Sequence, residues 1–104
     1  MQKILIVLLL LITFISGSNG ENILKDDFTN KNEWTYIADN VMGGISKGGV
    51  EFNSFDSDVY ALLSGDVSTE NNGGFIQIRR ELKNIDLSKA KSIRVYARGN
   101  NEKY

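Results

Sequence analysis

Apolar and polar residues alternate along most of the chain after Glu21, and alternation with a period of two is typical of half-buried β-strands. Four segments show either this alternation or an unbroken apolar run of the length of a strand. They are 50–54, 60–67, 74–82 and 92–98. No segment after Glu21 carries the period of an amphipathic helix. The pattern therefore predicts an all-β domain.

Clusters of Gly and Asn separate these strands, at 43–44, 48–49, 71–74 and 99–101. Such residues adopt the positive φ angles that tight turns need, and we expect 71–74 to be a hairpin turn. Asp86 begins a further turn before the last strand. Gly/Asn turns between short strands predict an antiparallel sandwich or jelly roll. Since such sandwiches have about seven strands, we expect this one to be incomplete at its C-terminus.

The N-terminus has a different character. Lys3 is the only charge before Glu21, residues 4–15 are apolar except for Thr13, and small polar residues follow. This order is typical of a secretory signal peptide. Ser18 and Gly20 are the first choice for the −3 and −1 positions, and Ser16 and Ser18 are the second. A membrane span would need roughly 20 apolar residues. We therefore expect residues 1–20 to be cleaved, leaving an exported domain over 21–104 (periplasmic or secreted) with no stable membrane span.

Composition excludes several classes of function. The 104 residues include no His, Cys or Pro, and 12 bases against 13 acids give a formal charge of −1. A chain without His or Cys has no Ser-His-Asp triad, no thiol nucleophile and no ordinary zinc site. The charge supplies no basic footprint for nucleic acid. No cofactor is expected.

Several motifs occur in an order that turn chemistry does not explain. They are Asp26-Asp27-Phe28, Trp34, Asp39-Asn40-Val41-Met42-Gly43-Gly44-Ile45-Ser46, Ser68-Thr69-Glu70-Asn71-Asn72-Gly73-Gly74-Phe75, Arg79, Asp86-Leu87-Ser88 and Arg98-Gly99-Asn100. In order and spacing this set resembles the complex I intermediate-associated protein 30 family over residues 26–104. The chain resembles the N-terminal portion of that domain.

The resemblance implies a galactose-binding-like β-sandwich. It also implies a non-enzymatic, chaperone-like role, because eukaryotic members bind assembly intermediates of respiratory complex I. Three features depart from the family, and the first is that its domain is longer, with later strands that this sequence lacks. The leader resembles a secretory signal where the best-known members carry mitochondrial targeting, and Lys89-Ala90-Lys91 stands where the family often has an aromatic residue and a Gly.

Two motif loops are candidate sites. Their residues are Asp39, Asn40, Met42, Gly43 and Gly44 in the first loop, and Asn71, Asn72, Gly73, Gly74 and Phe75 in the second. Either the first loop binds a polar ligand or partner, or Asp39 and Asn40 bond to loop amides and Met42 plugs the core. The favoured interpretation is the second, in which these residues hold the loop in shape rather than bind a ligand. Glu70 with the two asparagines offers too few carboxylates for a calcium site, so no metal is expected.

One strand face offers a candidate partner-binding surface. Arg79 shares a face with Phe75 and Gln77, and Arg94, Tyr96 and Arg98 share a face of the last strand. If the two strands are neighbours, these residues form one surface of a kind enriched at protein interfaces. The alternative is a solvated face whose arginines pair with nearby acids.

The sequence thus predicts a non-catalytic protein-binding domain that resembles an assembly factor. The alternative is an exported carbohydrate-binding module that would use Trp34, Tyr36, Tyr60 and Tyr96, although we expect Trp34 in the core. A hydrolase using two carboxylates is the least favoured class, since nothing singles out a pair.

Overall fold

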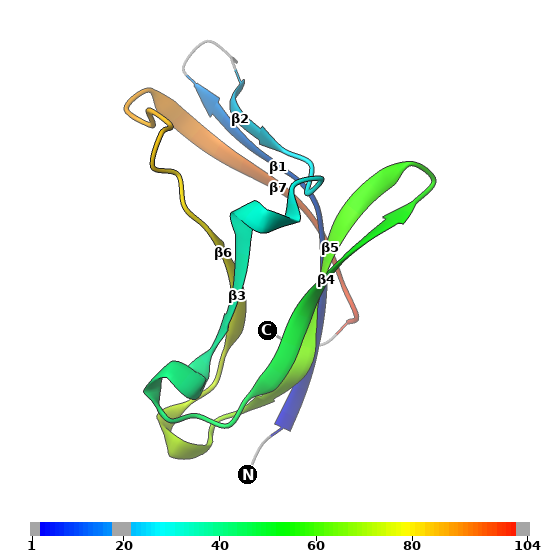
Figure 1. Cartoon of the computed structure of the whole chain (residues 1–104), viewed down its shortest axis with the longest axis vertical. Coiled ribbons are helices and arrows are strands. Elements are labelled where there is room, and N and C mark those ends of the chain that lie inside the picture. The colour runs from blue at the N-terminus through cyan, green and yellow to red at the C-terminus, as the bar shows by residue number, and fades with distance from the viewer. Residues whose placement is uncertain (1–2, 18–21, 102–104) are drawn as a thin grey trace.

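The computed structural model describes residues 3–17 and 22–101, and over these residues the chain is all β (Figure 1). The strands are β1 (Lys3–Gly17), β2 (Asn22–Asp26), β3 (Trp34–Ala38), β4 (Lys47–Phe55), β5 (Asp58–Ser68), β6 (Ile76–Arg80) and β7 (Ala90–Gly99). Three 3-10 turns connect them, η1 (Lys31–Glu33), η2 (Asp39–Met42) and η3 (Glu70–Asn72). Among the described residues no helix is long and apolar enough to cross a membrane.

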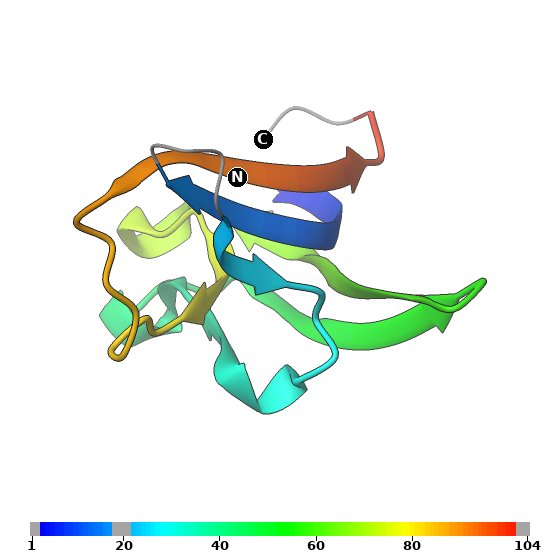
Figure 2. The ribbon, with the colours of Figure 1, turned by 90° about the horizontal axis from the view of Figure 1, so that it is seen from above.

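The strands form two antiparallel sheets. The larger has the order β2-β1-β5-β4, with β7 on the opposite edge of β1 from β5. The smaller consists of β3 and β6, with Trp34 opposite Arg80 and Ala38 opposite Ile76. Figure 2 shows β1 and β7 running side by side above the rest of the molecule. The predicted all-β antiparallel class is confirmed.

The core lies between the smaller sheet and β5. Ala38, Leu63, Val67 and Ile76 are buried there, and Tyr36 and Ile78 pack against them. The alternation in β6 sets this arrangement, because Ile76 and Ile78 face the core while Gln77 and Arg79 face outward, as the sequence predicts.

The four predicted strands correspond to β4, β5, β6 and β7. The sequence did not predict β2 and β3, which have only five residues each and lack a clean alternation. Gly48 is not a turn residue but lies inside β4, opposite Gly65 of β5. A Cβ at Gly48 would lie closer than 3 Å to the Ser64 carbonyl oxygen, so glycine permits the two strands to approach.

The turns agree only in part with the sequence predictions. Asp56 and Ser57 both have positive φ angles and form a two-residue hairpin between β4 and β5. The predicted hairpin at 71–74 is wrong, because β5 and β6 belong to different sheets. Asn71 and Asn72 have the expected positive φ angles, but they carry the chain from one sheet to the other.

Most of the predicted leader forms strand β1, which has β2, β5 and β7 as neighbours. The proposed −3 and −1 residues of the cleavage site, Ser18 and Gly20, lie outside the described residues. Cleavage before Glu21 stays a prediction.

Candidate binding surfaces

The two motif loops meet at the buried carboxylate of Asp39, which has no exposed surface. Its Oδ1 accepts a hydrogen bond from the Ser46 backbone N–H (3.0 Å), and its Oδ2 accepts from the Ser46 hydroxyl and the Gly74 N–H (2.7 Å). The Ser46 hydroxyl oxygen in turn accepts from the Ser68 N–H (3.0 Å). We call Asp39, Gly44, Ser46, Ser68, Gly73 and Gly74 the Asp39 cluster. It fastens the β3–β4 connection to the β5–β6 connection, next to each other in the lower part of Figure 1.

Glycine is required on two sides of this carboxylate. A Cβ at Gly44 or at Gly73 would lie closer than 3 Å to the Asp39 carboxyl carbon. Gly43 meets no neighbour but has a φ of 90°, which closes η2 in the left-handed region. One glycine of each Gly-Gly pair, Gly44 and Gly73, is therefore explained by the buried acid, and the other, Gly43 and Gly74, by a positive φ angle.

Burial and hydrogen bonding act in opposite directions on Asp39. Burial disfavours the charged carboxylate, but the hydrogen bonds from Ser46, Gly74 and Phe75 outweigh it and hold the pKa of Asp39 below its ordinary value. Burial, together with the Asp39 charge, raises the pKa of Tyr36. The Tyr36 hydroxyl is buried and has no hydrogen-bond partner among the described residues.

The structural interpretation of the first loop is confirmed for Asp39. Asn40 differs slightly from expectation, since its amide donates to the Ser46 carbonyl (3.2 Å) rather than bonding to a loop N–H. The prediction that Met42 plugs the core is wrong: its side chain is 58% exposed and that of Val41 is 76% exposed. The reason is that η2 turns the chain back at Gly43, which leaves both side chains at the tip of a connection anchored through Asp39.

The second loop is tied to Asp39 through its backbone. Over residues 3–17 and 22–101 no group of three or more acidic side chains gathers. Gly74 and Phe75 instead direct their backbone N–H groups to Asp39.

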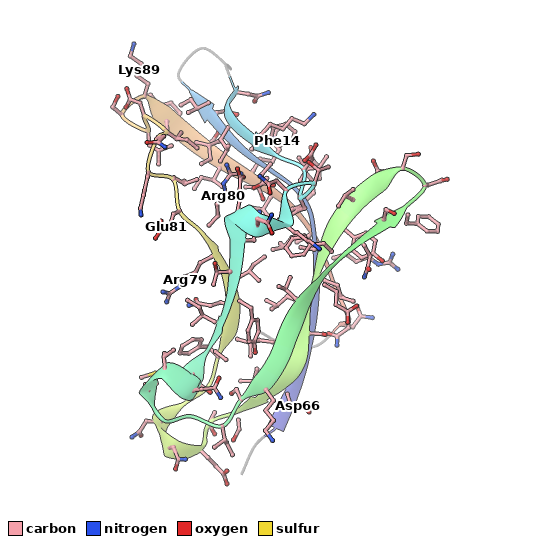
Figure 3. All side chains as sticks on the ribbon, in the orientation of Figure 1. Phe14, Asp66, Arg79, Arg80, Glu81 and Lys89 are labelled. Atoms are coloured by element: carbon pink, nitrogen blue, oxygen red, sulfur yellow. The ribbon has the colours of Figure 1, made fainter. Side chains whose placement is uncertain are left out.

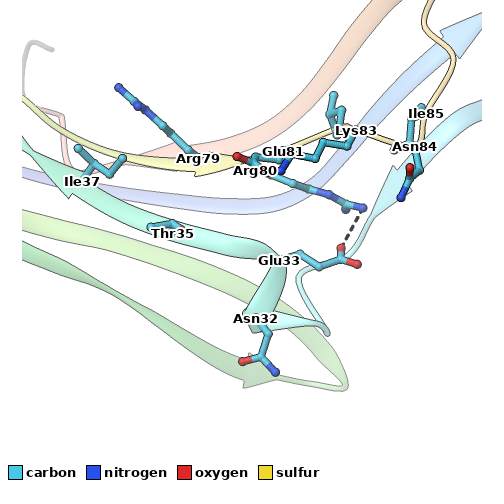
Figure 4. Close-up of a pocket in the computed structure, with 11 residues that line it drawn as sticks. Asn32, Glu33, Thr35, Ile37, Arg79, Arg80, Glu81, Lys83, Asn84 and Ile85 are labelled. Atoms are coloured by element: carbon cyan, nitrogen blue, oxygen red, sulfur yellow. Dashed lines mark ion pairs between the residues drawn. The ribbon is translucent and has the colours of Figure 1, made fainter.

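A second polar cluster lies at the other end of β3. Asp26 accepts from the Phe28 N–H (2.8 Å) and the Trp34 indole N–H (2.9 Å), and it pairs with Arg80. Arg80 also pairs with Glu33 (2.9 Å), as Figure 4 shows. The Trp34 ring packs 5.2 Å from that of buried Phe28. Trp34 was expected in the core; it is half-buried in this second cluster and outside the core cluster, with its ring packed on Phe28 and its indole N–H donated to Asp26.

A cavity of about 600 Å³ opens beside this cluster. It lies over the outward face of β3 and β6 and the segment after β6, and its lining includes Thr35, Ile37, Arg79, Glu81 and Lys83. Glu81 pairs with Lys83 (2.9 Å), rather than with an arginine. Arg79 is exposed and forms no ion pair with any described residue (Figure 3).

The predicted single surface of arginine and tyrosine side chains required the two strands to be neighbours, and they are not. Arg79 lies on β6 in the smaller sheet, whereas Arg94, Tyr96 and Arg98 lie on β7, which pairs with β1 in the larger sheet. The strand parity within each strand was predicted correctly, but the neighbour relation was wrong because the chain crosses between sheets after β5. All four side chains are exposed.

Strand β7 itself is unusual, since every side chain from Lys91 to Arg98 is exposed. Ile93 is 70% exposed on one face, and Tyr96 on the other makes an edge-to-face contact with Phe14 of β1, with ring centroids 6.2 Å apart. The sequence did not indicate that Ile93, Val41 and Met42 are exposed. An apolar residue in an alternating strand or in a motif is expected to be buried, and no local signal marks it as exposed.

Comparison with known proteins gives one match. The family model described as Complex I intermediate-associated protein 30 (CIA30) matches residues 24–104. No curated protein and no solved structure matches the chain significantly. The match covers all of β3 to β7, both motif loops and the Asp39 cluster. The chain belongs to the Complex I intermediate-associated protein 30 family.

Proposed function

We propose that this chain is a non-catalytic protein-binding domain that acts in the manner of an assembly factor. The observation that carries the proposal is the loop tip formed by Val41, Met42 and Ile45, which exposes three apolar side chains. Its backbone is held by the hydrogen bonds and close packing around Asp39. A rigid backbone lowers the conformational entropy lost on binding, and apolar side chains supply the buried area.

The exposed arginine and tyrosine side chains are proposed as a second part of the partner contact. Arg79 is open above the cavity on the outer face of β3 and β6, and Arg94, Tyr96 and Arg98 are open on β7. Arg and Tyr are enriched among the residues that dominate binding energy at interfaces. Since they lie in two different sheets, they form two separate contact regions.

We also propose that the domain is exported after removal of residues 1–20. The apolar run after Lys3 and the small residues at 16–20 support this proposal. N-terminal sequencing of the protein recovered outside the cytoplasm tests it. A first residue of Glu21 is expected, and recovery of an intact Met1 from that fraction would reject it.

The protein-binding proposal is tested by affinity capture with the full chain as bait, followed by quantitative mass spectrometry. A Val41→Ser, Met42→Ser double variant is expected to reduce partner recovery at least tenfold. The matched control is Phe55→Ser, because Phe55 is also 76% exposed but lies at the tip of the β4–β5 hairpin. Arg79→Ala and Arg98→Ala are each expected to reduce recovery severalfold. Unchanged recovery with the loop double variant would reject the loop as the binding element.

A further inference from the structure

The cavity of about 600 Å³ on the outer face of β3 and β6 is lined by three basic side chains, and they differ in how they are paired. Arg80 is shared between two carboxylates, one of them that of Glu33. Lys83 pairs with Glu81 (2.9 Å). Arg79 is exposed and forms no ion pair in the described part of the chain. It is therefore the lining cation whose charge no described carboxylate neutralises.

A neighbouring side chain orients this guanidinium. With its amide assigned from the hydrogen-bond network, the side-chain oxygen of Gln77 accepts from Arg79 Nε (2.8 Å) and Nη2 (2.7 Å). These two bonds occupy the side edge of the planar group. Over the described residues, the end edge formed by Nη1 and Nη2 has no carboxylate partner. Two parallel N–H groups on one edge match the two oxygens of a carboxylate.

The register of the smaller sheet adds a hydroxyl and an aliphatic side chain beside this edge. Thr35 is opposite Arg79, and Ile37 is opposite Gln77. Directly opposed residues share one face of a sheet, with Cβ atoms about 4.5–5.5 Å apart. Thr35, Ile37 and Arg79 all line the cavity, and Figure 4 shows Ile37 and Arg79 toward the same end of it. An unpaired guanidinium edge, a hydroxyl and an aliphatic surface thus lie together.

We propose that this cavity binds a single carboxylate carried on a compact aliphatic body. The end edge of Arg79 and the Thr35 hydroxyl donate hydrogen bonds to the carboxylate. The body covers Ile37, Leu82 and Ile85, which are half-buried and line the same cavity. Covering partly exposed aliphatic side chains is favourable.

The charges in the cavity limit the ligand to one anionic group. Arg80 and Lys83 already have carboxylate partners, and the partners in the lining are Glu33 and Glu81. A second anionic group on the ligand would meet these acids without a free cation. The inference rests on the proposed binding role of Arg79 and names the chemical group that Arg79 takes.

The test is a direct titration of the full chain, followed by two-dimensional amide NMR. Isocaproate represents a free short-chain acid, and N-acetyl-leucine represents the C-terminal residue of a polypeptide. Ligands with about ten non-hydrogen atoms reach dissociation constants on the order of 1 mM. We expect saturable shifts at the Thr35 and Ile37 amides and at the Arg79 Nε–H. Binding of only one acid identifies the source of the carboxylate, and binding of both supports the chemistry that they share.

The controls separate a specific site from general attraction to a cation. N-acetyl-leucine amide keeps the body but lacks the charge, and it should bind about tenfold more weakly or worse. Arg79→Gln should weaken acid binding by a similar factor. Lys89→Gln removes the same charge from an exposed side chain that Figure 3 shows well away from Arg79, and it should change binding less than about twofold. Near-UV circular dichroism checks that both variants keep the wild-type fold.

Three results would each overturn the proposal. They are failure of both acids to bind, equal binding of N-acetyl-leucine and its amide, and equal loss of binding in Arg79→Gln and Lys89→Gln. These results are independent of the protein-binding test, because no partner protein takes part in the titration. Partner recovery that still depends on the loop tip while both acids fail would keep the binding function and reject the acid site. Acid binding without any captured partner would do the reverse.

Discussion

The Asp39 cluster and strand β7 both lie within the residues that the family model matches, yet the polar groups of the first are buried and hydrogen-bonded whereas the side chains of the second are exposed. Asp39 is fully buried and receives hydrogen bonds from Ser46, Gly74 and Phe75, all inside residues 39–75. Strand β7 is exposed along Lys91 to Arg98, and its described pairing is with β1 alone. The hydrogen bonds of the Asp39 cluster are all made within residues 39–75, whereas the backbone pairing of β7 depends on the neighbouring strand β1.

This difference is visible in the dimensions of the molecule. Its Cα radius of gyration is 15.4 Å, against about 13 Å for a compact domain of roughly 100 residues. The tip of the β4–β5 hairpin and the end of the molecule formed by β2, β7 and the second half of β1 extend away from the core (Figure 1). We infer that stability is concentrated around the core and the Asp39 cluster, while β7 is available for binding.

The largest effect is expected from Asp39→Ala. The substitution leaves the buried Ser46 N–H without an acceptor and removes an acceptor from the Ser46 hydroxyl and the Gly74 N–H, and an unsatisfied buried donor is more costly than a lost contact. We expect the largest fall in melting temperature of any single substitution in the two motif loops. Near-UV circular dichroism of the full chain during a thermal melt measures it. The control is Asn40→Ala, which removes one hydrogen bond from an exposed side chain; equal losses for the two variants would contradict the central role of Asp39.

A pair of glycine substitutions tests whether packing around the cluster is as tight as inferred. Gly44→Ala places a Cβ closer than 3 Å to the Asp39 carboxyl group, while Gly49→Ala meets no atom within 4 Å. Overpacking of this kind costs roughly 1–3 kcal/mol, and replacing an unhindered glycine changes stability by less than about 1 kcal/mol. Urea titration of both variants gives the two free energies of unfolding. A Gly44→Ala variant as stable as Gly49→Ala would show that the carboxylate can move aside.

The pH dependence of stability follows from the same carboxylate. The pKa of Asp39 is lower in the folded chain than its ordinary value of 3.8, so the unfolded chain binds the proton more readily. Its contribution to stability is therefore complete above about pH 5 and is lost as the pH falls through the folded pKa, below 4. Unfolding midpoints measured between pH 7 and pH 2.5 should decline in that acidic range. The decline should be shallower in Asp39→Ala; an identical slope would assign the effect to other acids.

The candidate residues predicted from the sequence include Asp39, Gly44, Gly73 and Gly74 of the cluster but not Ser46 or Ser68, which bond to Asp39 and to each other. Asp39 and Gly44 lie five positions apart, so turn chemistry could suggest that they act together. Gly73 and Gly74 lie more than thirty positions away, and only the sheet crossing at η3 brings them to the carboxylate. Parity within β6 and β7 was likewise local and correct. Which sheet each strand joins depends on pairing across the whole chain, and no short pattern encodes it.

The smallest effect on stability is expected on β7. Ile93 is 70% exposed with β1 in place, so Ile93→Ser removes little buried area and should change the free energy of unfolding by less than about 0.5 kcal/mol. Urea titration of the full chain at low protein concentration measures this change. Analytical ultracentrifugation at high concentration should show less self-association for the variant, because a large apolar side chain has left an exposed strand. A loss of more than about 2 kcal/mol would mean that this face of β7 is covered in solution. In that case β7 would not differ from the Asp39 cluster in burial, because the side chains of both regions would be covered.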